Sequence, residues 1–352
     1  MSERSEAGRE LNIDMTLRVY GKNRIVFLLA LVLLLVLAAV WSLFSGDIDV
    51  SWKQLPFVLQ HPDSMEYAVL VNLRIPRLLL SFAVGASLSI SGAILQGIYK
   101  NPLVEPFTLG ISGGASLGVA LTIVSGLSAA IGGLILPLAG FLGAFITIFL
   151  VYVLGIRRSS SNVNRMLLTG VMISFVCSSL LMFLLSISSS ENMHSIIFWT
   201  MGSLDEPNGT LIVTMLTGCF VVYLLSHFFA NSLNAMQLGE DDARHLGVNV
   251  SLTIKILFVM TSLLTGLCVS IAGIIGFVGL VIPHIMRKAI GSDFRVLLTA
   301  SFLGGGLFLI VCDVLARTLI APNELPVGVL TGIIGGIAFI ILLSKKEAAW
   351  RK

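Results

Sequence analysis

Charged residues are scarce in this sequence. Only 12% of its 352 residues are Asp, Glu, Lys or Arg, whereas 56% are hydrophobic. Soluble domains carry roughly 25% charged residues, so the composition excludes a soluble globular protein. Apolar runs recur along the chain, each near the roughly 20 residues that a helix needs to cross a hydrocarbon core about 30 Å thick. The composition therefore predicts an all-α membrane protein with many spans.

Cysteine is also sparse, and its spacing suggests neither a metal site nor a disulfide framework. The four cysteines are widely separated in apolar runs, at Cys177, Cys219, Cys268 and Cys312. Because no C-x-x-C pair occurs, no zinc site or disulfide scaffold is indicated. We expect buried and inert thiols, which is how free cysteine usually behaves.

Motifs for catalysis and for nucleotide binding are missing. The sequence has no G-x-x-x-x-G-K-[ST], so the chain is not itself a P-loop ATPase. It has no H-E-x-x-H and no paired carboxylates, and we predict no catalytic residue, no metal ligand and no bound cofactor. The net charge of +3 reflects basic residues that set orientation rather than form a patch, so we expect no nucleic-acid partner.

Acidic residues are almost absent from the apolar runs. Ionisable side chains are costly inside a membrane and usually mark ion pathways, and an ion-driven carrier needs acids or broken-helix ion sites at mid-membrane. Their scarcity argues that the energy for transport comes from elsewhere, which disfavours an ion-coupled secondary transporter. The lack of a catalytic constellation disfavours a membrane enzyme.

Ten spans are predicted. They cover about Ile25–Phe44, Arg74–Tyr99, a Gly-rich run from Phe107, Ile131–Leu154, Met166–Ile187, Thr210–Phe229, Leu252–Ile271, Ile274–Ile285, Val296–Leu315 and Val327–Leu343. Of these, Ile274–Ile285 is short and broken by Gly276, Gly279 and Pro283. Another apolar piece, His194–Met201, is too short to cross and is interpreted as a re-entrant or lip helix. The chain thus divides into a leader (1–24), a membrane domain (25–344) and a tail (345–352).

Basic residues predict the orientation of these spans, because cytoplasmic segments carry an excess of Lys and Arg. With both termini in the cytoplasm, only Lys53, Arg74, Arg77 and Arg317 of the 22 basic residues face outward. The reverse topology places nearly all of them outside. Asp313 lies one turn before Arg317, where an i,i+4 ion pair would explain both residues.

The stretch LGEDDARHLGVNV, 238–250, lies between two spans and is too charged for hydrocarbon. Three acids follow Gly239, where the positive end of a helix dipole favours them, and Gly247 sits where a left-handed residue commonly ends a helix. The pattern indicates a two-turn helix parallel to the membrane surface, and an ordinary polar connection is the alternative.

Small residues recur where close helix packing is expected, because lipid gives helices little hydrophobic reason to associate. Two helix faces carry glycine at every fourth position, Gly110/Gly114/Gly118 and Gly328/Gly332/Gly336, and further small surfaces occur at Gly85/Ser89 and at Gly304–Gly306. We interpret most of these as packing within the bundle. Two stretches, ISGAILQG from Ile90 and IAGIIGFVG from Ile271, share I-x-G-x-I, but this is too short to establish an inverted repeat.

Four segments resemble a known family, in matching order: NLRIPRLLLSFAVGASLSISGAILQGIYKNPLVEPFTLGISGGASLG (72–118), LGEDDARHLGV (238–248), GFVGLVIPHIMR (276–287) and ELPVGVLTGIIGG (324–336). They resemble the permease subunits of binding-protein-dependent ABC importers for ferric siderophores, haem and cobalamin. The resemblance implies a type II importer bundle of about ten helices in a bacterial cytoplasmic (inner) membrane. It also implies a dimer with an identical or related permease, two ATPase subunits that bind ATP and Mg, and an extracytoplasmic substrate-binding protein. A ferric siderophore is the expected substrate, with cobalamin or haem as the alternatives.

The same resemblance implies three sets of site residues. Arg74, Arg77 and Arg317 would dock acidic residues of the binding protein, unless they are interfacial anchors or, for Arg317, the partner of Asp313. The coupling helix that meets the ATPase would comprise Leu238, Gly239, Glu240, Asp241, Asp242, Ala243, Arg244, Leu246 and Gly247, with Leu238, Ala243 and Leu246 as its apolar contact. The inner gate would comprise Ser160, Ser161, Asn162, Val163 and Asn164.

Overall fold

The computed structural model describes residues 2–46, 52, 58, 60–128, 132–156 and 163–350, with side chains outside 2–22, 156, 163–164, 343 and 345–350. Within these residues the structure is helical and contains no strand. The helices are α1 (Ser2–Phe44), α3 (Met65–Tyr67), η2 (Ala68–Arg74), α4 (Ile75–Tyr99), η3 (Pro106–Leu109), α5 (Ile111–Val124), α7 (Ile135–Ile156), α8 (Val163–Ile187), α9 (Ser190–Met201), α10 (Gly209–Phe228), α11 (Ala230–Leu238), α12 (Glu240–His245), α13 (Val250–Ala272), α14 (Val278–Ile290), α15 (Phe294–Thr318) and α16 (Val327–Trp350).

Each of the ten predicted spans corresponds to a helix. Among the described residues, seven helices are long and apolar enough to cross a membrane, and two shorter apolar ones cover Ile111–Val124 and Val327–Leu342. The tenth is the 13-residue α14. The short apolar piece that sequence alone marks as too brief to cross is α9, which begins four residues earlier than expected, at Ser190.

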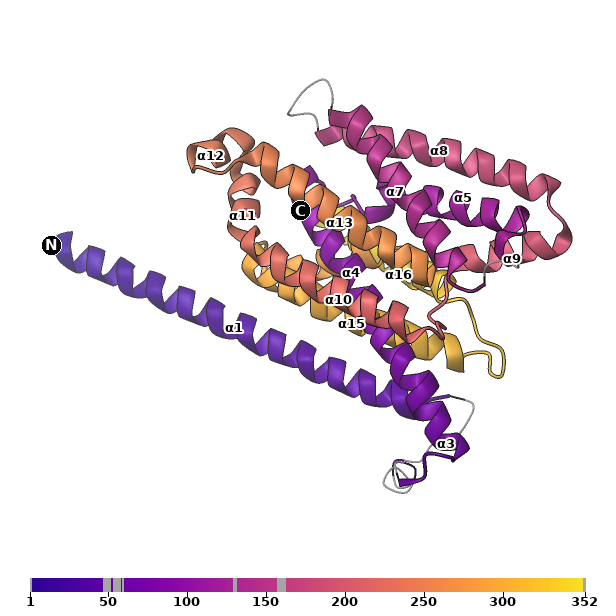
Figure 1. Cartoon of the computed structure of the whole chain (residues 1–352). Helices are drawn as coiled ribbons and strands as arrows, with labels where there is room; N and C mark the ends of the chain where they lie inside the picture. Colours follow the sequence, from indigo (N-terminus) through magenta and orange to yellow (C-terminus); the bar gives the residue numbers. More distant parts are fainter. Residues whose placement is uncertain are drawn as a thin grey trace.

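The centre of the bundle is α4, which runs through the other helices in Figure 1. In the most apolar stretch of this span 83% of residues are buried, whereas the corresponding value for α8 is 11%. Helices α10, α13, α14 and α15 pack around α4, and α8 lies at the edge of the molecule (Figure 1). The peripheral helix α8 therefore presents most of its apolar side chains to the outside.

Small residues let α4 approach two neighbouring helices closely. A Cβ atom on Gly85 would overlap the carbonyl oxygen of Gly305 on α15, and a Cβ atom on Gly92 would overlap that of Gly279 on α14. Gly92 and Gly279 belong to the two stretches that share I-x-G-x-I, so these stretches pack against each other. The contacts lie within one chain, as expected for glycines that pack the bundle.

Two boundaries differ from the sequence-based prediction. The second span begins before Arg74, because α3 and the π-helix η2 continue directly into α4 from Met65. The short span is not broken at Pro283: α14 starts after Phe277 and continues through this proline to Ile290.

Pro283 is tolerated because a side chain from another helix replaces the hydrogen bond that proline cannot make. A proline has no N–H to donate to the carbonyl four residues before it, which here belongs to Gly279. The side-chain amide of Gln96 on α4 donates to that carbonyl at 3.2 Å and to the Leu280 carbonyl at 3.3 Å. The sequence of α14 by itself could not predict that Gln96 donates these hydrogen bonds.

Candidate functional site at the two ends of the bundle

Three predicted outward arginines converge at one end of the bundle. Arg74 ends η2, Arg77 lies in the first turn of α4, and Arg317 lies in the last turn of α15. Because α4 begins where the neighbouring α15 ends, the three side chains line one cavity of about 230 Å³ together with Asp205 and Glu324. We call these five residues the arginine cluster.

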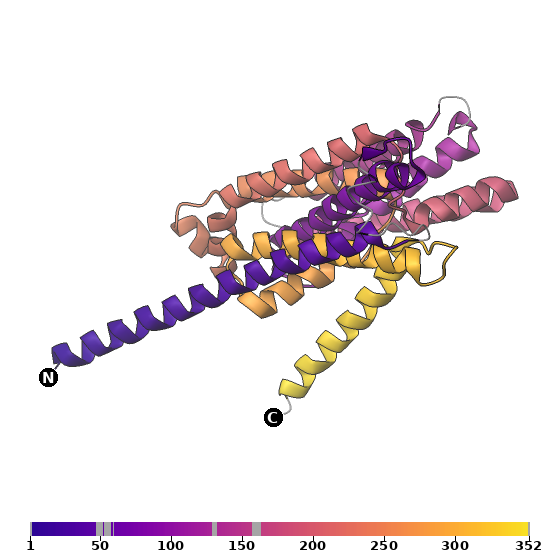
Figure 2. The ribbon, with the colours of Figure 1, turned by 90° about the horizontal axis from the view of Figure 1, so that it is seen from below.

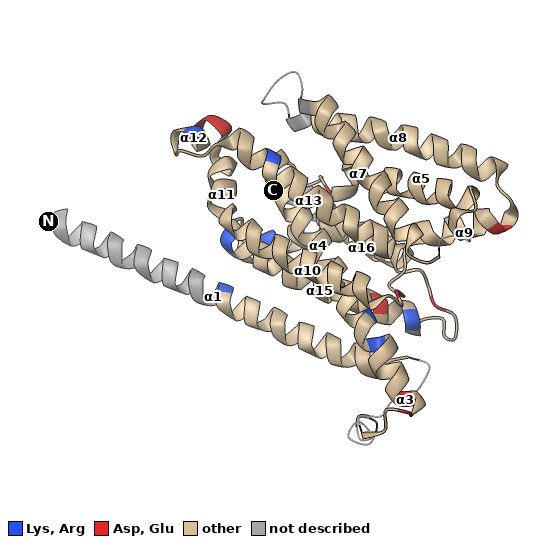
Figure 3. Ribbon diagram, in the orientation of Figure 1, with Lys and Arg blue, Asp and Glu red and all other residues tan. Residues whose placement is uncertain are grey.

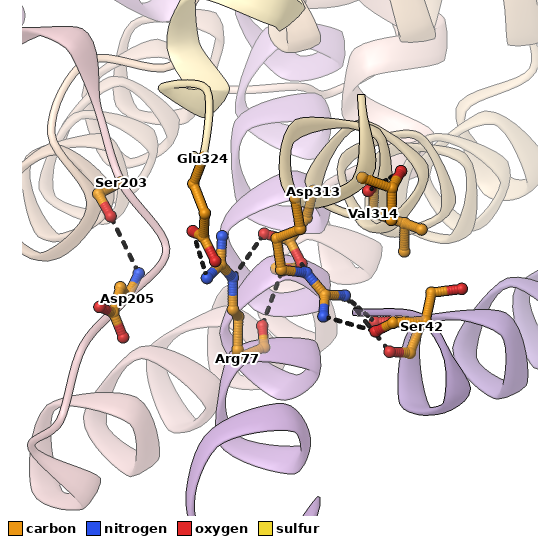
Figure 4. Close-up of polar contacts among 11 residues, drawn as sticks. Ser42, Arg77, Ser203, Asp205, Asp313, Val314 and Glu324 are labelled. Carbon is orange, nitrogen blue, oxygen red and sulfur yellow. Dashed lines mark hydrogen bonds and ion pairs between the residues drawn. The ribbon is translucent and has the colours of Figure 1, made fainter. Parts of the chain in front are cut away.

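Carboxylates pair with Arg77 and with Arg317, and Figure 4 shows Asp313 and Glu324 on either side of Arg77. The Arg77 guanidinium lies 2.8 Å from Asp313 Oδ1 and 2.8 Å from Glu324 Oε2, and Arg317 Nε lies 3.2 Å from Asp313 Oδ2. The Asp313 side chain is 1% exposed, whereas that of Glu324 is 49% exposed. A buried acid therefore holds α4 to α15, and a half-exposed acid covers Arg77 from outside.

The other contacts of these arginines satisfy the C-terminal end of α1. The last carbonyls of a helix have no partner within it. Arg74 Nη1 donates to the Leu43 carbonyl at 2.8 Å, and Arg317 donates to the Ser45 and Ser42 carbonyls at 3.1 and 3.3 Å and to Ser42 Oγ at 3.0 Å. Arg74 and Arg317 are both buried.

The structure thus contains the predicted i,i+4 ion pair of Asp313 and Arg317. The buried side chains of Arg74 and Arg317 also bind the C-terminal end of α1. Sequence reasoning had not included Asp205 and Glu324 among the site residues. The sequence could have indicated both acids, because the ten-span topology places the segment with Asp205 and the segment with Glu324 on the same side of the membrane as the arginines. Docking of a partner on the arginine cluster remains a prediction.

The opposite end carries α12, on which Figure 3 shows acidic and basic residues close together. The helix Glu240–His245 is shorter than the predicted stretch, and Leu238 ends the preceding α11. Arg244 lies 3.6 Å from both Glu240 and Asp241, so these charges pair along one helix face. Gly247 has a φ of 83° and ends the turn as its position predicts.

One apolar residue of the predicted coupling surface is not available to a partner. Leu238 and Leu246 are 69% and 64% exposed, but Ala243 is 0% exposed. The prediction that Ala243 contacts the ATPase is wrong, because its methyl group packs against the chain's own core. Leu238 and Leu246 remain accessible on either side of α12.

The predicted inner gate is only partly covered by the structure. Ser160, Ser161 and Asn162 lie outside the described residues, and Val163 and Asn164 begin α8 with side chains that are not described. Gating therefore stays a prediction. The four cysteines are free and buried, and the described residues contain no cluster of His, Cys, Asp and Glu that could hold a metal ion.

Comparison with known proteins adds to this geometry. Residues 33–345 match the FecCD transport family. The chain belongs to this family. It is a permease subunit of an ABC importer and a multi-pass membrane protein, and the family implies a partner permease and ATPase subunits in the complex. The predicted family and the all-α permease fold are confirmed.

Several relatives are similar along most of the chain. A hemin transport system permease protein from Yersinia pestis, HmuU, is 37% identical over 326 residues, which cover 90% of this chain and 95% of that protein. A vitamin B12 import system permease protein from Klebsiella pneumoniae, BtuC, is 38% identical over 279 residues, covering 78% and 82% of the two chains.

Solved structures match as well. One, described as an inward-facing conformation of a metal-chelate type ABC transporter, has a TM-score of 0.81 and 32% identity, covering 91% of this chain and 99% of that one. A second, PsaBC from Streptococcus pneumoniae, has a TM-score of 0.55 and 16% identity over 82% and 94% of the two chains. The second likeness supports the fold alone.

Proposed function

We propose that this permease forms the translocation path for a ferric siderophore, driven by separate ATPase subunits and loaded by an extracytoplasmic substrate-binding protein. The likeness to a structure described as a metal-chelate type ABC transporter, at 32% identity over 91% of this chain, carries the proposal. The similarity to a permease named for hemin, which is an iron complex, supports an iron-containing substrate. The chain has no P-loop with which to hydrolyse ATP itself. Haem and cobalamin are the alternatives, because relatives named for hemin transport and for vitamin B12 import match at similar identity.

Reconstitution in liposomes tests this function. The permease, its ATPase subunits and its binding protein are assembled, and uptake of a radiolabelled ferric siderophore is followed with and without ATP. We expect uptake that requires both ATP and the binding protein and that excess haem or cobalamin does not inhibit. Inhibition by haem or by cobalamin would transfer the assignment to that substrate, and uptake by the permease alone would contradict an ABC importer.

The arginine cluster is the proposed docking site for the binding protein. Arg77 is the arginine whose counter-charge can be exchanged, because its outer partner Glu324 is half exposed while its inner partner Asp313 is buried. An acidic residue of the binding protein would take the place of Glu324 on Arg77, with Arg74 and Arg317 adding positive potential beneath. Charge pairs of this kind steer association and fix register more than they add affinity.

If an acid of the binding protein replaces Glu324 on Arg77, substitutions at Glu324 and at Arg77 should change the association rate in opposite directions. Glu324→Gln removes the competing carboxylate, so the association rate with the binding protein should rise at low salt. Arg77→Gln should lower that rate, and the difference should shrink as salt screens the charges. Asp63→Asn, a change of an acid outside the arginine cluster, is the control. Equal association rates for both variants and the control would contradict docking here.

We also propose that α12 seats in an ATPase subunit, with Leu238 and Leu246 as apolar contacts and Glu240, Asp241, Asp242 and Arg244 as the polar rim. The exposure of these two leucines at the end of the molecule opposite the arginine cluster supports this role.

Near Asn164, a cross-link between two permease copies should block transport if residues 160–164 form the inner gate. Full transport with the cross-link in place would contradict that gate.

A further inference from the structure

A second cavity, of about 630 Å³, lies at the α12 end of the bundle. Its charged lining is entirely basic: Lys100 follows α4, and Arg287 and Lys288 lie in the last turn of α14. Gln96 and Gln237 contribute amides, while Phe294 and Leu342 contribute apolar walls. We call this the basic cavity.

Arg287 is the charged residue of the basic cavity whose surroundings favour an anionic ligand. It is partly buried, and its Nη1 donates to Oε1 of the buried Gln96 at 3.1 Å. Gln96 is oriented by its two bonds to the Gly279 and Leu280 carbonyls, so its oxygen is turned toward Arg287. Among the described ion pairs none includes Arg287, and a partly buried charge without a counter-charge is costly.

The acid nearest in sequence to the lining is already engaged elsewhere. Asp293 precedes Phe294, but its carboxylate accepts from Asn234 at 2.8 Å and lies 3.5 Å from Arg24. No ion pair among the described side chains therefore compensates the positive charge of Arg287.

Helix dipoles account for only part of this charge. The C-terminal ends of α4 and α14 each carry roughly half a negative charge. Against the three positive charges of Lys100, Arg287 and Lys288, two such ends leave a surplus of about +2. Interfacial lysines alone are common, but here two rim lysines share one cavity with a partly buried guanidinium that the Gln96 amide holds in place.

We propose that the basic cavity binds a phosphate group, carried by an anionic phospholipid. Arginine presents a planar fork that matches phosphate oxygens, and basic pockets between transmembrane helices suit lipid head groups. Figure 2 shows α16 diverging from the other helices toward its C-terminal end, so apolar Leu342 faces a cavity rather than a packed neighbour. The apolar walls would accommodate the glycerol and the first acyl carbons of a lipid whose phosphate meets Arg287.

Lipid binding to the full-length chain, purified with the partner subunits that accompany it, tests this site by native mass spectrometry. The probes are phosphatidylglycerol, phosphatidylcholine with the same acyl chains, and inorganic phosphate. We expect phosphatidylglycerol to bind more tightly than phosphatidylcholine and Arg287→Gln to weaken it about ten-fold, as for loss of a charge-assisted hydrogen bond.

The double variant Lys100→Gln/Lys288→Gln repeats the test at the exposed rim, in case the change at Arg287 disturbs folding. Lys255→Gln, the same exchange on α13 outside the cavity, is the matched control. If inorganic phosphate displaces phosphatidylglycerol from the natural chain but not from these variants, the basic cavity binds phosphate, and a soluble phosphate compound can be its ligand. Equal binding of the two lipids, or equal behaviour of the rim variant and Lys255→Gln, would overturn the proposal.

Discussion

The arginines at the two ends of the bundle differ in what surrounds them. At the arginine cluster, Arg77 and Arg317 share the buried carboxylate of Asp313, and Arg74 and Arg317 bind carbonyls at the end of α1. At the basic cavity, Arg287 contacts a neutral amide. One end is satisfied within the chain, whereas the other keeps a surplus of positive charge. The free energy of unfolding should therefore depend strongly on charge at the first end and weakly at the second.

The largest expected effect comes from Asp313→Asn. Removing one partner of a buried ion pair costs about 3–5 kcal/mol, because the remaining charges stay buried without compensation. Denaturant unfolding in detergent micelles measures the loss. Glu324→Gln is the control, because its pair with Arg77 is half exposed and contributes about 1 kcal/mol or less. Similar losses for both variants would contradict the central role of Asp313.

At the other end, Gln96→Met tests whether the Gln96 amide stabilises the Arg287 guanidinium, for which the described side chains form no ion pair. This change retains the side chain's length but leaves the Gly279 carbonyl and Arg287 without their partner. We expect a loss of about 1–3 kcal/mol, the cost of a buried polar group left unsatisfied. An unchanged free energy of unfolding would mean that water or another group already satisfies them.

A smaller effect is expected from Asp293, the N-cap of α15. Burial alone would raise the pKa of this carboxyl, but hydrogen bonds from Asn234 and the Arg295 backbone N–H, with the charges of Arg24 and Arg295, lower it overall. Because the pKa falls on folding, the stabilisation is complete above the unfolded value near 3.8 and is lost as pH drops through the folded value. Asp293→Ala should cost about 1 kcal/mol at neutral pH.

The pH profile separates this cap from general surface effects. The difference between the natural chain and Asp293→Ala should stay constant from pH 7 to about pH 5 and shrink only in stronger acid. The control is Asp241→Ala, whose side chain is 90% exposed and lies 3.6 Å from the neighbouring Arg244. A difference that disappears above pH 5 would assign the stabilisation to another group.

The smallest effect on unfolding is expected at α12. Leu238→Asp and Leu246→Asp change exposed side chains, so the free energy of unfolding should move by about 0.5 kcal/mol or less. Co-purification of the ATPase subunits should nevertheless fall sharply if α12 is their seat. Retained co-purification in both variants would count against that role, and Ala243→Asp, at a buried position, should instead destabilise the chain itself.

The sequence was most informative where one periodic pattern decides the outcome. Long apolar runs such as 252–271 can only be buried or lipid-facing helices, and glycines at every fourth position predict close packing. It failed where a distant residue supplies the missing interaction. The sequence predicts a break at Pro283, but the side-chain amide of Gln96, on a helix far earlier in the chain, donates the hydrogen bond to Gly279 that the missing N–H cannot make. Similarly, nothing local indicates that Ala243 faces inward.

Composition and order along the chain determined that this protein is a membrane-spanning helical bundle, because apolar runs of about 20 residues can satisfy their backbone groups inside hydrocarbon by forming helices. The motifs, with their order, also determined its family. Only the tertiary structure decided which charges are neutralised. Ion pairs and caps join helices far apart in sequence, so the pairing of Arg77 with Asp313 and the surplus at Arg287 depend on which helix ends meet.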